Sequence, residues 1–237
     1  MDLSSFATAG ALLPAASRSP RWRPGLAGAR HSEVFASGRE ASGAGAALAL
    51  ALNGLRADGS DAGRAVLWVQ DAASLRLTGR PYRAGLPPPL RTCLIHVAAK
   101  SCQDALFALE EGVRCRELAC VIGEIAGNPK ALDMTASRRL SLTAEQYGVP
   151  LFLVRLDAAR DLSSARMRWQ VRAAPSPRPQ WNAQAPGTPT WHAELFRARG
   201  HAAGEWILHG KDQELVATPP DHGDLAAAPG DRSLAAV

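Results

Sequence analysis

Short runs of apolar residues alternate with amphipathic segments between residues 31 and 156. Five of these runs are expected to be strands: HSEVFA (31–36), AVLWVQD (65–71), TCLIHVAA (92–99), LACVIGEI (118–125) and VPLFLVRL (149–156). Strands that are apolar on both faces are typical of a parallel sheet covered by helices on both sides. The pattern therefore predicts an α/β fold with right-handed crossovers.

The segments between these strands predict the covering helices: AALALALNGLRADG (46–59), SCQDALFALEEGVRC (101–115) and TASRRLSLTAEQYG (135–148). In the second, Ser101 is expected as the N-cap, and the apolar residues Ala105, Leu106, Leu109 and Val113 recur at helical spacing. By contrast, the prolines of LTGRPYRAGLPPPL (77–90) predict irregular structure, because they remove hydrogen-bond donors and fix φ.

The last part of the chain has a different pattern. Residues 166–173, 190–200 and 205–210 alternate polar and apolar positions, and GHAAG (200–204) is typical of a hairpin turn. We therefore expect a mostly parallel sheet flanked by helices, with antiparallel strands at its C-terminal edge.

Composition sets the expected domain boundaries. A chain of 237 residues with 46% hydrophobic residues is long enough for one large domain with tails. Residues 1–30, with four arginines and one acidic residue, predict a flexible basic leader, and residues 217–237 predict a disordered acidic tail. The domain is expected over residues 31–216. No apolar run approaches the roughly 20 residues that span a bilayer.

The cysteines and histidines do not predict a metal site. Cys93, Cys102, Cys115 and Cys120 form no C-x-x-C pair, and the six histidines are scattered, with no H-E-x-x-H motif. We interpret the cysteines as free thiols in a reducing compartment, and expect a cytoplasmic protein without metal.

The net charge of +5 comes almost entirely from arginine. A basic body suits a partner with a phosphate backbone or an acidic protein surface. The alternative is a solvated surface without a specific partner.

The stretch GREASGAG (38–45) nearly matches a phosphate-binding loop. Gly38 and Gly43 have the spacing of the glycines in G-x-x-x-x-G-K-[ST], and the stretch lies between a predicted strand and a predicted helix. Ala44 and Gly45 stand where the lysine and the hydroxyl residue are required.

The second half of such a site is a strand that ends in an aspartate for Mg²⁺. LACVIGEI has Gly123 at that position, followed by Glu124. Because lysine, hydroxyl and aspartate are all absent, we expect no ATP hydrolysis and no cofactor.

The order of these elements resembles the RecA-like family, and within it the ImuA group of bacterial damage-inducible mutagenesis proteins. The resemblance runs from about His31 to Gly210. It rests on HSEVFA before the degenerate loop, AVLWVQD, DALFALEEGVRCRELACVIGEI, LDMTASRRLSLTAEQYGVPLFLVR and the closing strands SSARMRWQVRA and TWHAELFRARG…GEWILHG.

The resemblance implies a non-catalytic accessory protein of SOS-induced translesion DNA synthesis and mutagenesis. Proteins of this group act beside an ImuB-like, inert Y-family polymerase relative and an error-prone C-family DNA polymerase, and RecA is a further candidate partner. Some members carry a SulA-like label.

The resemblance also implies candidate DNA contacts. RecA grips single strands with two loops, which by position are Glu124–Asp133 and Arg155–Ser164 here. The candidates for phosphate contact are Lys130, Arg138, Arg139, Arg155 and Arg160. For Arg138 and Arg139, a solvated helix face is the alternative.

Four tryptophans lie in the closing region: Trp169, Trp181, Trp191 and Trp206. They can stack on bases or pack on the sheet. We expect the edge strands at 190–210, together with the acidic tail, to dock a partner chain, with Trp191 and Trp206 as anchors. Two further functions stay open: an atypical P-loop nucleotide-binding enzyme, and a direct single-stranded DNA-binding module.

Overall fold

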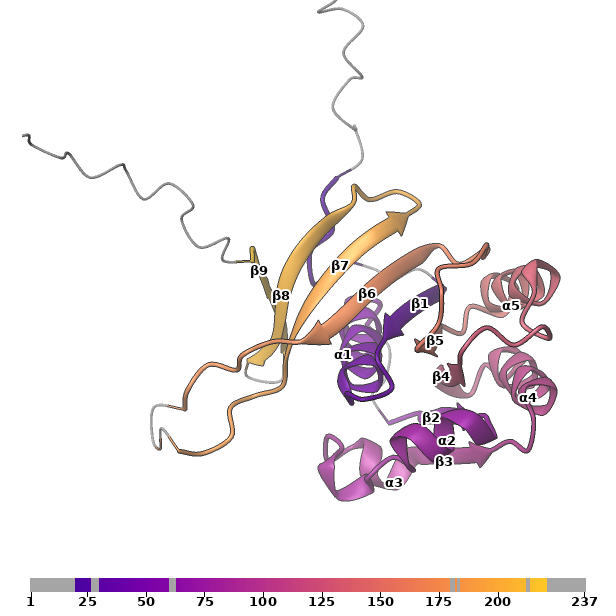
Figure 1. The fold of residues 1–237 in the computed structure, drawn as a ribbon, viewed down its shortest axis with the longest axis horizontal. Helices are drawn as coiled ribbons and strands as arrows, with labels where there is room; N and C mark the ends of the chain where they lie inside the picture. Colours follow the sequence, from indigo (N-terminus) through magenta and orange to yellow (C-terminus); the bar gives the residue numbers. More distant parts are fainter. Residues whose placement is uncertain are drawn as a thin grey trace, which may run out of the picture.

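A single mixed sheet organises the computed structural model, which describes residues 20–26, 30–59, 63–179, 182, 184–211 and 214–220. Within these residues the strand order is β3-β2-β4-β5-β1-β6-β7-β8-β9 (Figure 1). The strands are β1 (His31–Ala36), β2 (Ala65–Gln70), β3 (Leu94–Ala98), β4 (Leu118–Ala126), β5 (Leu151–Leu156), β6 (Met167–Ala173), β7 (Thr190–Ala198), β8 (Gly204–Lys211) and β9 (Glu214–Thr218).

Pairing is parallel from β3 through β6 and antiparallel from β6 through β9. The helices are α1 (Ser42–Ala57), α2 (Ala72–Thr78), α3 (Leu90–Cys93), α4 (Cys102–Arg114) and α5 (Met134–Tyr147), with a 3₁₀ helix, η2 (Arg83–Gly85). The predicted fold class, a mostly parallel sheet flanked by helices with antiparallel strands at the C-terminal edge, is confirmed.

Helices cover both faces of the parallel half, as the apolar strands require. In β5, Phe152 and Val154 belong to the hydrophobic core on the α1 side, whereas Leu151 and Leu153 belong to the core under α4 and α5. This alternation follows from the two-residue period of a strand. Ser101 caps α4 as expected, since its Oγ accepts a hydrogen bond from the Asp104 N–H at 3.1 Å.

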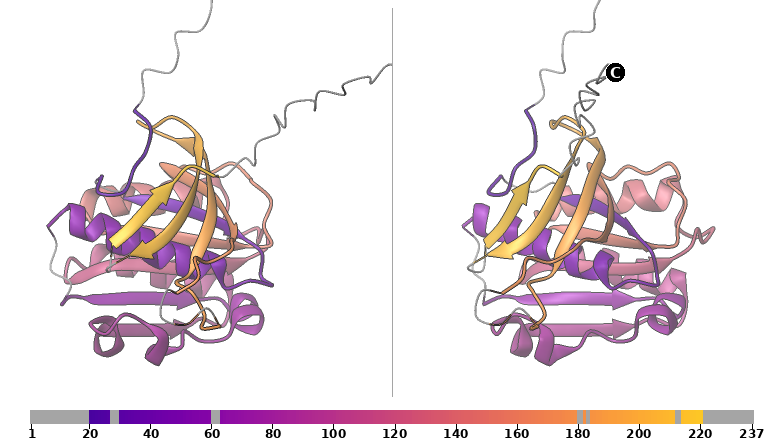
Figure 2. Two further views of the ribbon diagram at one scale, coloured as in Figure 1. Left: turned by 90° about the vertical axis from the view of Figure 1, so that its left-hand side faces the viewer. Right: turned by 60° about the vertical axis from the view of Figure 1, so that its left-hand side comes forward.

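The antiparallel half curves over α1, so that β9 comes into contact with that helix (Figure 2). Four short elements of the structure were not predicted: α2, η2, α3 and β9. η2 lies within the segment expected to be irregular, and α3 includes Thr92 and Cys93 of a predicted strand. Residues 72–78 form α2, whose N-cap Asp71 accepts from the Ser74 N–H at 2.7 Å. Glu214–Thr218 form β9, which crosses the boundary expected at residue 216.

The boundary expected at residue 30 also differs from the structure. Trp22 is only 4% exposed and belongs to the core on the α1 side. Its ring lies edge-on to Trp169 and Trp206, with centroids 4.8 and 5.5 Å away. A single tryptophan in a segment rich in Pro, Gly and Ser gives no periodic signal, so the sequence did not predict that Trp22 is buried. Residues 1–19 and 221–237, which make up most of the predicted leader and tail, lie outside the described residues.

No helix in the described part of the chain is long and apolar enough to cross a membrane.

Candidate functional site

The degenerate phosphate loop has the expected setting, because it joins the end of β1 to the start of α1. Its hydrogen bonds involve carboxylates of this same chain. The Gly38 N–H donates to Asp157 Oδ1 at 3.0 Å, and Glu40 Oε2 accepts from the Ser42 hydroxyl and the Ala173 N–H at 3.0 and 2.8 Å. Two negative charges therefore lie at the place where a phosphate loop needs room for an anion.

Asp157 is held in this position by its backbone. It follows β5 directly, its N–H donates to the Ala36 carbonyl at 3.0 Å, and its φ of 50° lies in the left-handed region. Aspartate tolerates that conformation better than most residues do. Its carboxylate is thus directed to the loop from the neighbouring strand.

Packing accounts for the loop's last residues. A Cβ on Gly43 would lie 2.8 Å from Ala36 Cβ and 2.9 Å from Val154 Cγ1, so glycine lets α1 approach the sheet. A Cβ on Gly45 would lie 3.0 Å from the ring of Trp191. Ala44 packs against the core on the α1 side.

The end of β4, where the Mg²⁺-binding aspartate of a phosphate-loop protein would lie, is also filled by side chains of this chain. A Cβ on Gly123 would lie 2.7 Å from Leu109 Cδ2, so the position of the missing aspartate is filled by packing of α4. Glu124 is buried, and its carboxylate accepts from Trp68 Nε1 at 2.6 Å and from the Thr78 hydroxyl at 3.0 Å. Burial raises the pKa of this carboxyl group. In the described ranges no group of three or more His, Cys, Asp or Glu residues is placed to hold a metal ion.

The five candidate DNA contacts do not form one surface. Arg155 is buried: its guanidinium lies 3.7 Å from Glu33 Oε1, donates to the Gly127 carbonyl, and its pKa is lowered by burial. Its proposed role in DNA contact is therefore wrong, because it does not reach solvent. Arg155 is buried because it lies in β5, whose other residues are apolar and buried in the core.

The other four candidates are at the surface. Arg139 is paired with Glu110, and Arg160 donates to Glu194 at 2.8 Å and lies over the ring of Phe196. Lys130 and Arg138 are exposed, and neither has an ion pair with any residue that the structure describes.

The tryptophans are packing residues. Trp206 is buried against Trp22 and Trp169, and Trp191 is buried against α1. The expected partner dock at residues 190–210 is therefore wrong in two respects. Its anchors face the core, and β7 and β8 are interior strands because β9 pairs beyond them. Trp181 lies outside the described residues.

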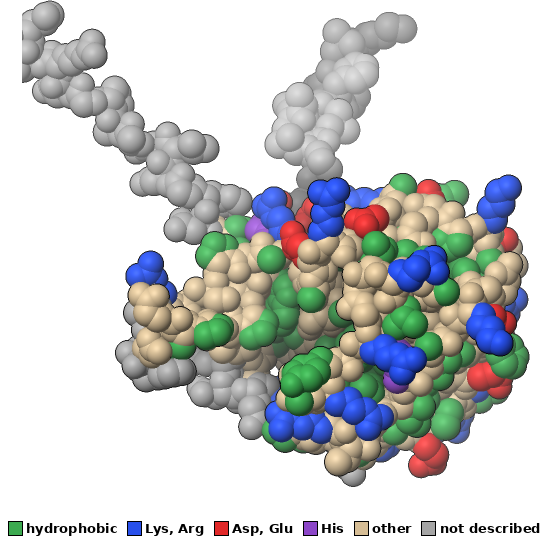
Figure 3. Space-filling model, turned by 60° about the horizontal axis from the view of Figure 1, so that its bottom comes forward, with side chains coloured by type: hydrophobic (Ala, Val, Ile, Leu, Met, Phe, Trp, Pro, Cys, Tyr) green, Lys and Arg blue, Asp and Glu red, His purple; other side chains and the backbone are tan. Residues whose placement is uncertain are grey.

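Two basic features were missed by the sequence analysis. The first, which we call the β3 face, surrounds the edge strand β3. Residues 72–103 contain no acidic residue. Figure 3 shows Lys and Arg side chains gathered around exposed hydrophobic groups on this side of the molecule. The exposed residues of the β3 face are Arg76, Leu77, Arg80, Tyr82, Arg83, Arg91, Ile95 and Lys100.

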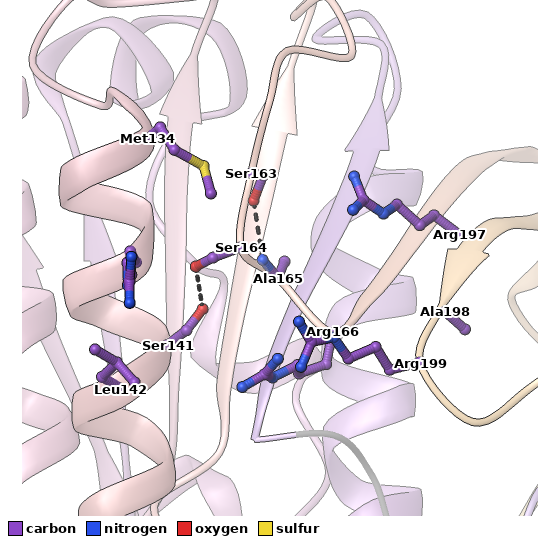
Figure 4. A pocket seen from close by; sticks show the side chains of 11 residues that line it. Met134, Ser141, Leu142, Ser163, Ser164, Ala165, Arg166, Arg197, Ala198 and Arg199 are labelled. Atoms are coloured by element: carbon purple, nitrogen blue, oxygen red, sulfur yellow. Dashed lines mark hydrogen bonds between the residues drawn. The ribbon is translucent and has the colours of Figure 1, made fainter.

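The second feature is a cavity of about 410 Å³ between α5, the segment before β6 and the end of β7. We call it the arginine cavity. Figure 4 shows Ser141 on α5 directed toward Ser164, with Arg166, Arg197 and Arg199 on the other side. The lining consists of Met134, Arg138, Ser141, Leu142, Ser163, Ser164, Ala165, Arg166, Arg197, Ala198 and Arg199. The only sequence signal was the arginine content of SSAR (163–166) and RAR (197–199), which are distant in the chain.

No protein-family model and no curated protein matches this chain.

Proposed function

We propose that this protein is a non-catalytic accessory protein of SOS-induced translesion DNA synthesis, and that it acts in the cytoplasm by holding partner proteins. The observation that carries the proposal is the occupied phosphate loop. Asp157 and Glu40 place carboxylates at the loop, and Ala44 and Gly45 offer neither a charge nor a metal ligand. The two carboxylates oppose the binding of a triphosphate, and positions 44 and 45 supply nothing that neutralises it.

The cellular role and the partners come from the resemblance to the ImuA group. They are the ImuB-like Y-family polymerase relative and the error-prone C-family DNA polymerase, with RecA as a further candidate. The alternative of an atypical P-loop enzyme requires nucleotide binding at this loop.

Equilibrium binding of a fluorescent ATP analogue with Mg²⁺ separates these two functions. We expect no saturable binding by the native protein, with an intact P-loop ATPase as positive control. Saturable binding that Gly38→Asp abolishes, in a variant whose circular dichroism is unchanged, would contradict the proposal.

The β3 face is the docking surface that best fits a partner protein. β3 is an edge strand, and an edge strand can pair with an added strand through its backbone. At its first residue the Leu94 carbonyl already accepts from Arg83 Nη2 at 2.9 Å, so pairing is open to the residues that follow. The pKa of His96 on β3 is lowered, mainly by burial and further by the positive charges of Arg80 and Arg83. The surroundings of the strand are therefore positively charged. We therefore assign to this face a partner segment that is extended and acidic.

Co-purification with the two co-expressed polymerase relatives tests this assignment. The variant Arg80→Glu/Lys100→Glu reverses two exposed charges on the β3 face. Arg172→Glu/Arg178→Glu makes the same charge change at exposed positions on and after β6. Loss of the complex with the β3-face variant and not with the control variant supports the dock. If both variants keep the complex, or both lose it equally, the dock is excluded.

A further inference from the structure

The arginine cavity combines features that favour a bound anion. Four arginines line it, and they come from three segments that are remote in sequence: α5, the chain before β6, and the end of β7. Among the residues that the structure describes, no carboxylate lines the cavity, although Glu33 lies behind it and accepts from the hydroxyl of the lining residue Ser163 at 2.9 Å. Bringing like charges together is unfavourable unless an opposite charge compensates them.

The compensation within this chain is incomplete. Arg166 is paired with Glu145, which holds the pKa of Glu145 below its usual value. Arg138, Arg197 and Arg199 have no ion pair with any described residue. The cavity therefore keeps an excess of positive charge.

The wall opposite Arg197 is a fixed set of serine hydroxyls. Ser141 Oγ lies 2.6 Å from Ser164 Oγ, and Ser137 Oγ lies 2.9 Å from Ser163 Oγ. Behind them, His31 Nδ1 lies 2.7 Å from Ser141 Oγ, whereas the buried His31 Nε2 has no hydrogen-bond partner among the residues that the structure describes. This network fixes α5 against the segment before β6 and so fixes the relative positions of two walls of the cavity.

We propose that the arginine cavity binds phosphate groups, supplied either by the backbone of a single-stranded nucleic acid or by a free polyphosphate. Guanidinium groups bind phosphate oxygens through paired N–H donors, and serine hydroxyls are common phosphate contacts. Met134 and Leu142 give the rim an apolar part on which a sugar or base can rest.

This site is separate from the degenerate loop. Ser141 contacts His31, the first residue of β1, whereas the degenerate loop begins after Ala36, the last residue of that strand. The choice of nucleic acid as one source of phosphate rests on the proposed role in DNA synthesis. The binding of phosphate groups by the arginine cavity is argued independently of that role.

Fluorescence anisotropy on the full chain without partners provides the test, so its result is separate from that of co-purification. The probe is a fluorescein-labelled oligothymidylate, with pyrophosphate and a polyglutamate peptide as competitors. The test variant is Arg197→Gln/Arg199→Gln, and the matched control is Arg172→Gln/Arg178→Gln, which removes the same charge beyond the cavity lining. All four arginines are exposed.

We expect the test variant to lose roughly tenfold or more in affinity and the slope of log K against log salt to fall by about 1.4, since each single-strand phosphate contact contributes about 0.7. The control keeps its affinity. Competition by pyrophosphate at concentrations similar to its own binding constant identifies a free polyphosphate as the source, and its failure to compete identifies the backbone.

Three results would overturn the proposal: no binding of the labelled oligothymidylate, equal loss in both variants, or displacement by polyglutamate in preference to pyrophosphate. If circular dichroism shows that the test variant is unfolded, Arg138→Gln, an exposed change on α5, replaces it under the same criteria.

Discussion

Gly43 lies in the first turn of α1, against Ala36 of β1 and Val154 of β5. Glycine is the residue that permits this approach, and the same reason applies to Gly123 beneath α4. Residue types that suggest nucleotide chemistry in the sequence thus have a packing explanation in the structure. The spacing of these glycines therefore resembles a nucleotide-binding motif without forming a site that can bind a nucleotide.

The substitution Gly43→Ala distinguishes these two explanations. Helix propensity alone predicts a gain of up to about 1 kcal/mol from Gly to Ala. We expect a loss of about 1–3 kcal/mol, because the added methyl overlaps two well-packed side chains. Urea unfolding of the purified variant measures the difference. A more stable variant would show that α1 can shift away from the sheet.

His31 carries a second residue-scale prediction. Burial lowers its pKa from 6.5 to about 4, helped by Arg166 and Arg168 and opposed by Glu33 and Glu145. Between pH 6.5 and pH 4 the unfolded chain binds a proton on this histidine and the folded chain does not. Stability is therefore lost as pH falls through this window, by about 1.4 kcal/mol per unit and about 3 kcal/mol in all.

Comparing His31→Asn with the native chain isolates this contribution, since the carboxylates titrate in both. We expect the plot of unfolding free energy against pH to be flatter for the variant by up to one proton between pH 6 and pH 4.5. Parallel plots would mean that His31 is protonated in the folded protein.

At the scale of elements, buried charge joins the strands in the middle of the sheet. Glu33 on β1 accepts from Arg168 Nε on β6 at 2.7 Å and from the Ser163 hydroxyl at 2.9 Å, and Arg155 on β5 lies 3.7 Å away. Both arginines also lie over the ring of Phe35. This cluster links the parallel strands to the first strand of the antiparallel half.

Glu33→Gln is expected to cost about 3–5 kcal/mol, because it leaves two buried guanidinium groups without their counter-ion. Glu194→Gln is the matched control. It breaks the surface pair with Arg160 and is expected to cost at most about 1 kcal/mol. Denaturant unfolding of both variants gives the comparison, and similar losses would contradict the role of the cluster.

At the scale of the whole molecule, the two halves of the sheet share α1. Strands β1, β4, β5 and β6 contact this helix, and β9 returns to it from the far edge. The segment before β1 closes the same core through Trp22. The folded unit therefore begins before the boundary that composition predicts.

Trp22→Ala tests that boundary. We expect a loss of about 3–5 kcal/mol, as for other large-to-small changes in a core. Tyr82→Ala, at a position 76% exposed, serves as the control and is expected to change stability by less than about 0.5 kcal/mol. If thermal unfolding shows that Trp22→Ala costs no more than Tyr82→Ala, the segment is not part of the folded unit.

The sequence alone determined the fold class and most element positions, because continuous apolar strands, helical spacing and glycine stops are local signals. It also showed that lysine, hydroxyl and aspartate are missing from the phosphate loop. It did not show that Asp157, more than a hundred residues away, supplies a carboxylate to that loop.

Only the tertiary structure decided which cations reach solvent. Arg155 and Arg138 look alike in sequence, yet one lies in a buried cluster and the other lines a cavity. Trp169, Trp191 and Trp206 were equally ambiguous until the curved sheet placed them in one core. Burial and charge compensation depend on residues that meet only after folding, and for that reason nothing in the chain predicted that the arginines of SSAR and RAR line one cavity.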